Sequence, residues 1–289
     1  MKVCVLGAGG LLGHMLIRVL SQSNDVYGST REVRSSSSPL ARFLSQDKWI
    51  GEIDALNSDS INRVFGFADF DVVINCIGLI KQRNSQVSDH EMMAVNAEFP
   101  HQLAQVANSH GTRVIHISTD CVFSGSKGNY VESDEPDPVD VYGKSKLLGE
   151  LNDTQNLTLR TSHIGRELTV RKSFIEWLLK HKGGRVDGYS HAIYSGLTTQ
   201  ELSRLISDLL NPNLGVTGMF HVSSQPISKL EIINKLNELL NLQIAVTSDS
   251  SVQINRSLNS EGFQRATGLT PNVWDQMLSE LCKDQKSYD

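Results

Sequence analysis

Short apolar runs alternate with amphipathic segments along the first 160 residues. Continuous apolar runs predict buried strands, whereas apolar residues spaced three and four apart predict helices. The predicted strands are residues 2–6, 25–29, 49–53, 71–76, 113–118 and 157–160. The predicted helices are residues 11–21, 60–67, 89–108 (interrupted or kinked at Pro100) and 142–151. This alternation predicts an α/β fold with a doubly wound parallel sheet covered by helices on both faces.

The pattern is less regular after residue 160. Helical spacing recurs in residues 174–180, 200–210 and 229–240, and residues 219–223 have the pattern of a strand. We therefore expect residues 1–160 to form the main sheet domain. Residues 161–289 are expected to form mainly a smaller α/β lobe, from which residues 217–224 return to the main sheet.

Composition narrows the class of protein. The chain has 289 residues, of which 39% are hydrophobic and 20% charged, as in an ordinary globular protein. A net charge of −5 without blocks of like charge argues against nucleic acid as a partner. The four scattered cysteines form no Cys-x-x-Cys pair, so we assign neither a metal site nor a disulfide framework. No basic leader precedes the first strand, and no apolar run approaches the ~20 residues of a membrane helix, so we expect a cytoplasmic protein without a membrane partner.

A glycine-rich turn joins the first predicted strand to the first predicted helix. Such a turn brings the backbone N–H groups of a helix N-terminus onto a pyrophosphate. The G-x-G-x-x-G register puts Leu12 where Gly or Ala belongs, whereas the G-x-x-G-x-x-G register fits without exception. This predicts a Rossmann-type dinucleotide-binding domain. The residues expected to bind the dinucleotide at this turn are Gly7, Gly10, Leu11, Leu12 and Gly13.

The end of the second predicted strand bears on which dinucleotide is bound. Folds that prefer NAD usually place an acidic residue there, but no carboxylate precedes Glu32. Ser29 and Thr30 can donate hydrogen bonds, and Arg31 can form a bidentate contact with a 2′-phosphate. NADPH is therefore favoured, with NADH left open. Asp54, after the third strand, is a candidate for the adenine amino group.

A phenol and an ammonium follow in the second half of the domain. Tyr142 and Lys146 lie four residues apart, hence on one face of a helix. A free tyrosine has a pKa of ~10, and a nearby ammonium favours its phenolate form. Lys146 can also bind the nicotinamide ribose, and a hydroxyl of Thr119 or Ser118 can hold a carbonyl oxygen as charge builds on it. This order predicts hydride transfer to or from a carbonyl.

These motifs resemble those of the extended short-chain dehydrogenase/reductases, and more narrowly of the dTDP-4-dehydrorhamnose reductase family, over nearly the whole chain. The most specific is the run Ser-Thr-Asp-Cys-Val-Phe-Ser-Gly at residues 118–125. The resemblance implies that Thr119 is the catalytic hydroxyl, Tyr142 the proton donor and Lys146 its activator. It implies NADPH-dependent reduction of the 4-keto group of a nucleotide-linked 4-keto-6-deoxy sugar, in the synthesis of surface polysaccharide precursors.

The resemblance also implies further contacts. On the cofactor side these are Cys76, Gly78, Asn96, Ser118 and Lys146, with Asn96 a candidate for holding a water or backbone that links Lys146 to solvent. On the substrate side they are Asp120, Cys121, Val122, Phe123, Tyr142, His163 and Arg256. Further candidates for the substrate diphosphate are Arg160, Arg166 and Arg185.

Several positions depart from the family pattern. Cys121 stands where the family usually has Tyr, and His163 where an aromatic such as Trp is expected. The segment 194–199 also lacks a usual proline. The hydride machinery looks intact, while the sugar and base stay open between dTDP-4-dehydrorhamnose and a UDP-linked N-acetylated relative.

Two other classes stay open. One is a nucleotide-sugar epimerase or dehydratase that retains its NAD. The other is a non-catalytic dinucleotide-binding subunit resembling the regulatory subunit of methionine adenosyltransferase, although the intact Tyr142 and Lys146 argue against it. The sequence leaves the oligomeric state undetermined, and a homodimer is the assembly we consider.

Overall fold

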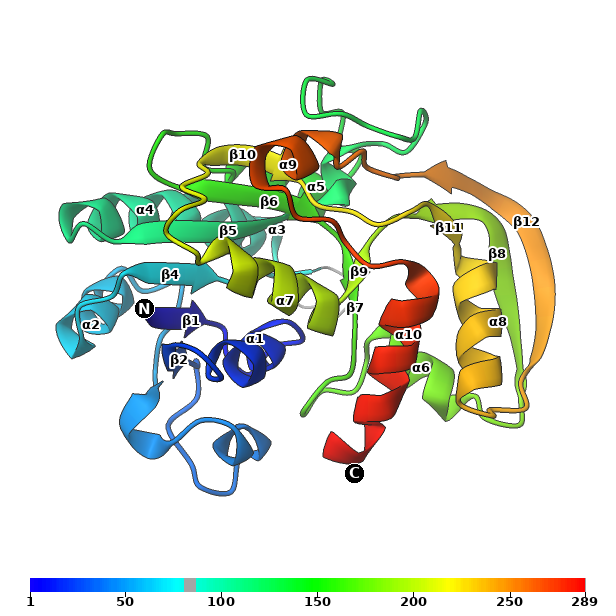
Figure 1. Ribbon diagram of the computed structural model, residues 1–289, viewed down its shortest axis with the longest axis horizontal. Coiled ribbons are helices and arrows are strands. Elements are labelled where there is room, and N and C mark those ends of the chain that lie inside the picture. Colours follow the sequence, from blue (N-terminus) through cyan, green and yellow to red (C-terminus); the bar gives the residue numbers. More distant parts are fainter. Residues whose placement is uncertain (81–86, 289) are drawn as a thin grey trace.

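A parallel sheet of seven strands forms the centre of the protein (Figure 1). The computed structural model describes residues 1–80 and 87–288. The strand order is β10-β6-β5-β4-β1-β2-β3, so the direction of winding reverses beside β1, where β2 and β4 flank it. This confirms the predicted doubly wound α/β fold. The strands are β1 (Lys2–Leu6), β2 (Asp25–Ser29), β3 (Trp49–Ile50), β4 (Val72–Asn75), β5 (Arg113–Thr119), β6 (Leu157–Thr161) and β10 (Gly218–His221).

Successive side chains of each strand point to opposite faces of the sheet, and both faces are buried. In β1, Val3 and Val5 join one apolar cluster and Cys4 and Leu6 join the other. The first cluster includes apolar side chains of α1 and α7, and the second includes those of α2 and α4. The bounds of these helices are α1 (Gly13–Leu20), α7 (Thr199–Leu209), α2 (Asp59–Phe67) and α4 (Phe99–Ser109).

The helix predicted at residues 89–108 is divided in the structure. It consists of α3 (Asp89–Met93), a π-helical turn η4 (Ala94–Glu98) and α4. Pro100 lies in the first turn of α4, and it has no N–H to donate to the π-helical turn that precedes this helix. The helix is therefore interrupted near Pro100, as predicted, by a π-helical turn that ends two residues before the proline.

The catalytic-motif helix α5 (Val141–Leu148) packs against that π-helical turn. Asp140 caps its first turn by accepting a hydrogen bond from the N–H of Gly143 at 2.8 Å. At the other end, a Cβ atom at Gly149 would collide with the carbonyl oxygen of Asn96. The close approach allowed by this glycine holds α5 beside the segment that follows β4.

The C-terminal half forms a lobe beside the sheet (Figure 1). The expected helices are α6 (Phe174–Lys180), α7 and α8 (Lys229–Leu239), and β10 returns to the main sheet next to β6 as expected. However, α7 covers the main sheet and packs on α1. The remaining elements were not expected from the sequence: β7 (His163–Ile164), β8 (Arg185–Tyr194), β9 (Leu197–Thr198), β11 (Ile227–Ser228), β12 (Ala245–Asn255), α9 (Glu261–Thr267) and α10 (Trp274–Lys283).

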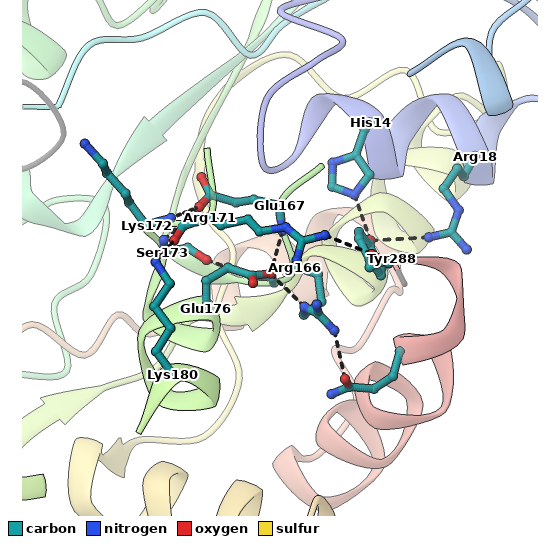
Figure 2. Close-up of polar contacts among 12 residues, drawn as sticks. His14, Arg18, Arg166, Glu167, Arg171, Lys172, Ser173, Glu176, Lys180 and Tyr288 are labelled. Carbon is teal, nitrogen blue, oxygen red and sulfur yellow. Dashed lines mark hydrogen bonds and ion pairs between the residues drawn. The ribbon is translucent and has the colours of Figure 1, made fainter. Parts of the chain in front are cut away.

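The C-terminal segment returns to the first helix (Figure 2). His14 donates from Nδ1 to the carbonyl oxygen of Gly10 at 2.8 Å, so its Nε2 accepts from the hydroxyl of Tyr288 at 2.7 Å. Arg18 binds both carboxylate oxygens of Asp284 at 2.6 and 2.7 Å. The last residues of the chain thereby fix the helix that follows the glycine turn.

Within the described part of the chain, no helix combines the length and the hydropathy needed to cross a lipid bilayer.

Candidate active site

The glycine turn between β1 and α1 has three positions where a side chain would be obstructed. Gly7 has a φ of +79°, and a Cβ atom there would lie 3.3 Å from the Cys76 carbonyl. A Cβ atom at Gly10 would lie 3.1 Å from the Gly7 oxygen, and one at Gly13 would overlap that oxygen. At Gly9 the nearest atom is 3.8 Å away, which is ordinary contact. The constrained positions are therefore those of the G-x-x-G-x-x-G register.

Of the two hydroxyls at the end of β2 that were expected to bind a cofactor, only one is available. Thr30 accepts a hydrogen bond from Trp49 Nε1 at 2.7 Å and donates to the Glu32 carbonyl at 3.0 Å. Because the Thr30 hydroxyl already donates its proton within this loop, the prediction that it donates to a cofactor is wrong for this structure. The Ser29 hydroxyl is buried without a hydrogen-bond partner among the described residues, and Arg31 is exposed at this edge.

Asp54 stabilises its own turn. One of its carboxylate oxygens accepts from the N–H of Leu56 at 3.0 Å, and its own N–H donates to the Ser60 hydroxyl at 3.0 Å. Its second carboxylate oxygen has no hydrogen bond to another described residue, and the expected adenine contact stays a prediction.

Asn96 is fully buried in the π-helical turn and joins two segments. Its Oδ1 accepts from the N–H of Leu79 at 2.8 Å, and its Nδ2 donates to the Leu79 carbonyl at 2.9 Å and to Ser145 Oγ at 3.1 Å. A Cβ atom at Gly78 would make ordinary contact with Asn96 Oδ1 at 3.5 Å. Asn96 thus binds backbone atoms of Leu79, while the expected link from Lys146 to solvent stays a prediction. Asn96 fixes the segment after β4 against α5.

The two hydroxyls at the end of β5 have different partners. Ser118 donates to Glu150 Oε1 at 2.6 Å, so its hydroxyl is bound to a carboxylate. Thr119 accepts from the N–H of Cys121 at 3.1 Å and donates to Asp120 Oδ1 at 3.2 Å. The Thr119 hydroxyl also interacts with Tyr142 and lowers the pKa of that phenol. These contacts favour Thr119 over Ser118 as the candidate catalytic hydroxyl, without use of the family resemblance.

Tyr142 and Lys146 both lie on α5, but their side chains have different surroundings. Burial raises the pKa of Tyr142 well above its ordinary value, against the opposing effect of Thr119. Lys146 is only 4% exposed; its Nζ donates to the Ile117 carbonyl at 2.7 Å and lies 3.2 Å from His116 Nε2. Burial lowers the pKa of Lys146 to about 8. Burial, and not a neighbouring ammonium, has the largest effect on the pKa of Tyr142, which is raised and not lowered as expected.

Arg256 lies over the segment that follows β5. Its Nε donates to the Phe123 carbonyl at 2.9 Å, and its Nη1 lies 3.4 Å from Cys121 Sγ. Burial raises the pKa of Asp120, and Arg256 opposes that rise. Burial likewise raises the pKa of Cys121, to about 12, so the residue in the usual tyrosine position is a neutral thiol. The structure brings these expected substrate-side residues together.

Val122 and Phe123 have no exposed side-chain surface. Phe123 stacks on Tyr130, with ring centroids 4.1 Å apart, and both belong to a small apolar cluster with Leu258. The expected contacts of these two residues with a substrate are therefore wrong for this structure, because packing buries both residues completely.

Three other candidates for a substrate diphosphate are not placed to bind one. Arg160 pairs with Glu150 at 2.7 Å, and Arg166 pairs with Glu176 at 2.6 Å (Figure 2). All four side chains are nearly buried, so these guanidinium groups are neutralised inside the protein. Arg185 is the first residue of β8. It lies at the far end of that strand from Ile193, which pairs with Asn255, the residue before Arg256. His163, in β7, is half-buried and pairs with Leu197.

Several polar residues near the site carry no sequence motif. Glu150 lies four residues after Lys146, a helical spacing that points to it, whereas nothing marks His116 inside its apolar strand. Tyr194, the last residue of β8, has a buried phenol oxygen, and burial raises the pKa of this phenol.

Chains that turn from the first strand into this glycine register, and that carry Tyr-x-x-x-Lys on the helix after the fifth strand, form the extended short-chain dehydrogenases/reductases. This chain is one of them. Within that class it belongs to the RmlD substrate binding domain family, whose model matches residues 1–286.

Individual relatives extend this result. The chain is 30% identical to a probable low-salt glycan biosynthesis reductase of Haloferax volcanii, over 78% of this chain and 75% of the relative. It is 26% identical to a dTDP-4-dehydrorhamnose reductase of Aggregatibacter actinomycetemcomitans, over 97% of this chain and 98% of the relative. A solved structure of Bacillus anthracis dTDP-4-dehydrorhamnose reductase in complex with NADP has a TM-score of 0.81 at 21% identity, covering 98% of this chain and 99% of that one.

Proposed function

We propose that this protein uses NADPH to reduce the 4-keto group of a nucleotide-linked 4-keto-6-deoxy sugar in surface polysaccharide precursor synthesis. The substrate is dTDP-4-dehydrorhamnose or a UDP-linked N-acetylated relative. The observation that carries the proposal is the meeting of Thr119 and Tyr142 at the carboxyl edge of the sheet. The relatives named as dTDP-4-dehydrorhamnose reductases and as a glycan biosynthesis reductase support the substrate class.

The residues at the carboxyl edge of β1 and β2 fit a dinucleotide phosphate. The obstructed positions Gly7, Gly10 and Gly13 keep side chains away from the turn, and the first N–H groups of a helix lack intrahelical partners. Three features support a 2′-phosphate: the Ser29 hydroxyl, which has no hydrogen-bond partner among the described residues, the exposed Arg31, and the lack of a carboxylate between Gly28 and Glu32. When bound, NADPH supplies the hydride that reduces the keto carbon.

The phenol of Tyr142 supplies the proton in this proposal. Its raised pKa keeps it protonated at neutral pH, which is the form that a reduction consumes. Tyr142 gives its proton to the keto oxygen, while the Thr119 hydroxyl holds that oxygen as charge develops on it. Arg256 and the neutral Cys121 lie on the side where the rest of the sugar nucleotide would bind.

Residues 1–160 would bind the cofactor, and residues 161–289 would bind mainly the substrate. The boundary is not strict, because α7 and β10 complete the cofactor-binding sheet from the later part of the chain. We place the protein in the cytoplasm, a reducing compartment that suits its four free cysteines.

Replacing Tyr142 with phenylalanine tests the mechanism. The variant should lose about 10²- to 10⁴-fold in kcat, the usual contribution of a positioned proton donor. Its Kd for NADPH, measured by fluorescence, should stay within twofold, because the substitution removes only a hydroxyl. Tyr189→Phe, on the exposed part of β8, is the matched control and should keep full activity. Full turnover in Tyr142→Phe would overturn the proposed role.

A further inference from the structure

The C-terminal segment (residues 284–288) brings a phenol to the helix that follows the glycine turn (Figure 2). Tyr288 is 5% exposed, and its hydroxyl lies 2.7 Å from Nε2 of His14, a fully buried residue of α1. Nδ1 of the same imidazole lies 2.8 Å from the carbonyl oxygen of Gly10, one of the obstructed glycines of the turn. A single side chain therefore connects Tyr288 to the turn.

The direction of these hydrogen bonds follows from the carbonyl of Gly10, which can only accept. Nδ1 of His14 therefore carries a proton and donates it. Burial has the largest effect on the pKa of His14 and lowers it, so the ring is neutral at neutral pH and its Nε2 is an acceptor. Tyr288 donates to this acceptor, and its oxygen accepts in turn from Arg18 Nη1 at 3.3 Å.

The Gly10 carbonyl orients the start of the helix. It also accepts from the N–H of His14 at 3.3 Å, the i→i−4 bond of a helix, so the N–H groups of Leu11, Leu12 and Gly13 precede the first donor. The N–H of Leu11 shares a planar peptide unit with this carbonyl and points the opposite way. When His14 holds the carbonyl, it therefore fixes the direction of an N–H group that the expected pyrophosphate would meet.

The C-terminal lobe holds the ring of Tyr288 in place. The Arg166 guanidinium lies 5.0 Å from the centroid of this ring, and Arg171 donates to the Tyr288 carbonyl at 3.1 Å. Arg166 is itself fixed by the buried carboxylate of Glu176 at 2.6 Å (Figure 2). The position of the phenol beside α1 is therefore set by side chains of the lobe.

We propose that Tyr288 is a positioning residue for the dinucleotide. Its hydroxyl fixes the Nδ1–H form of His14, which in turn holds the Gly10 carbonyl so that the turn binds the pyrophosphate. The lobe that is expected to bind mainly the substrate thereby also sets the affinity for the cofactor. The inference deepens the proposed function and rests on it in taking the glycine turn as the phosphate site. Sequence patterns do not reveal the pair, because His14 and Tyr288 lie 274 positions apart.

Binding of NADPH to the full-length protein, measured by fluorescence titration, tests the inference. Tyr288→Phe removes the hydroxyl and keeps the ring, and its Kd should rise about three- to tenfold, the usual effect of one lost hydrogen bond. Circular dichroism would identify a temperature at which every variant is folded.

Ser287→Ala is the matched control for this titration. It removes a hydroxyl from the same segment, but that hydroxyl contacts Arg18 and Asp284 and not His14. The Kd of this variant should stay within about twofold of the wild-type value. A rise of less than about threefold in Tyr288→Phe, or an equal rise in Ser287→Ala, would overturn the inference.

A double-mutant cycle tests whether Tyr288 acts through His14. In His14→Asn the amide nitrogen can replace Nδ1 as the donor to Gly10, whereas the acceptor for Tyr288 is lost. This variant should bind NADPH within about threefold of the wild type, and the addition of Tyr288→Phe should change its Kd by less than about twofold. A general loss of stability would instead weaken binding equally in both backgrounds. That result, or weaker binding by His14→Asn than by Tyr288→Phe, would overturn the inference.

Nuclear magnetic resonance of the protein without ligand gives an independent readout. With ¹⁵N-labelled histidine, the signal that disappears in His14→Asn should be that of the Nδ1–H tautomer, and this form should lose population in Tyr288→Phe. An Nε2–H tautomer in the wild type would overturn the inference. A wild type that binds NADPH but reduces no 4-keto sugar would count only against the proposed function, whereas one that binds no dinucleotide would overturn both.

Discussion

At the scale of single residues, identical chemical groups differ in role because their partners differ. Ser118 and Thr119 are adjacent hydroxyls on β5, but the alternation of a strand sends their side chains to opposite faces. One meets the carboxylate of Glu150, and the other interacts with the phenol of Tyr142. Composition and spacing do not tell which of the two hydroxyls faces the reacting phenol, whereas their positions in the fold do.

Thr119→Val is expected to lower kcat by about 10²- to 10³-fold, the usual cost of removing one donor to a developing oxyanion. The substitution keeps the volume and β-branching of the residue, so folding and NADPH binding should persist. Thr161→Val is the matched control, because Thr161 pairs with Thr119 in the neighbouring strand β6 and is equally buried. Steady-state kinetics would compare the two variants. Equal rates in Thr119→Val and the control would exclude the proposed role of Thr119.

At the scale of elements, strand β1 shows how buried apolar residues guide prediction. It has the predicted bounds, because apolar residues fill all of its buried positions. The strands β8 and β12 were missed, since polar residues and glycine dominate them and much of their surface is exposed. Backbone pairing holds these two strands together, and such pairing leaves no clear pattern of apolar residues in the sequence.

The C-terminal segment is a second element that no local pattern predicts. Tyr288→Phe should lower the free energy of unfolding by about 1–3 kcal/mol, because the buried Nε2 of His14 loses its partner. Urea denaturation monitored by circular dichroism would measure the change. Tyr189→Phe removes a hydroxyl from a more exposed ring and should have little effect. Stability equal to that of the wild type would mean that the Tyr288 hydroxyl does not help to fix α1.

At the scale of the whole molecule, the site gathers residues from strand ends that are distant in sequence. The topology of a parallel sheet predicts this gathering, because all its carboxyl ends meet at one edge. The glycine turn could be predicted from its spacing. The proximity of Thr119, Tyr142 and Lys146 could be predicted from the order of strands and helices. The sequence did not predict the buried ion pair of Glu150 with Arg160, because such pairs depend on tertiary packing.

NADPH absorbance, followed with a panel of dTDP- and UDP-linked 4-keto-6-deoxy sugars that are each generated in place by the matching dehydratase, measures the proposed reduction itself. We expect NADPH to be oxidised with at least one member of the panel and the product to be the 4-hydroxy sugar. Reactions without this protein control for background oxidation. Failure to oxidise NADPH with any member, in a protein that binds NADPH, would contradict the account. Tightly retained NAD in the purified protein would then favour an epimerase or dehydratase.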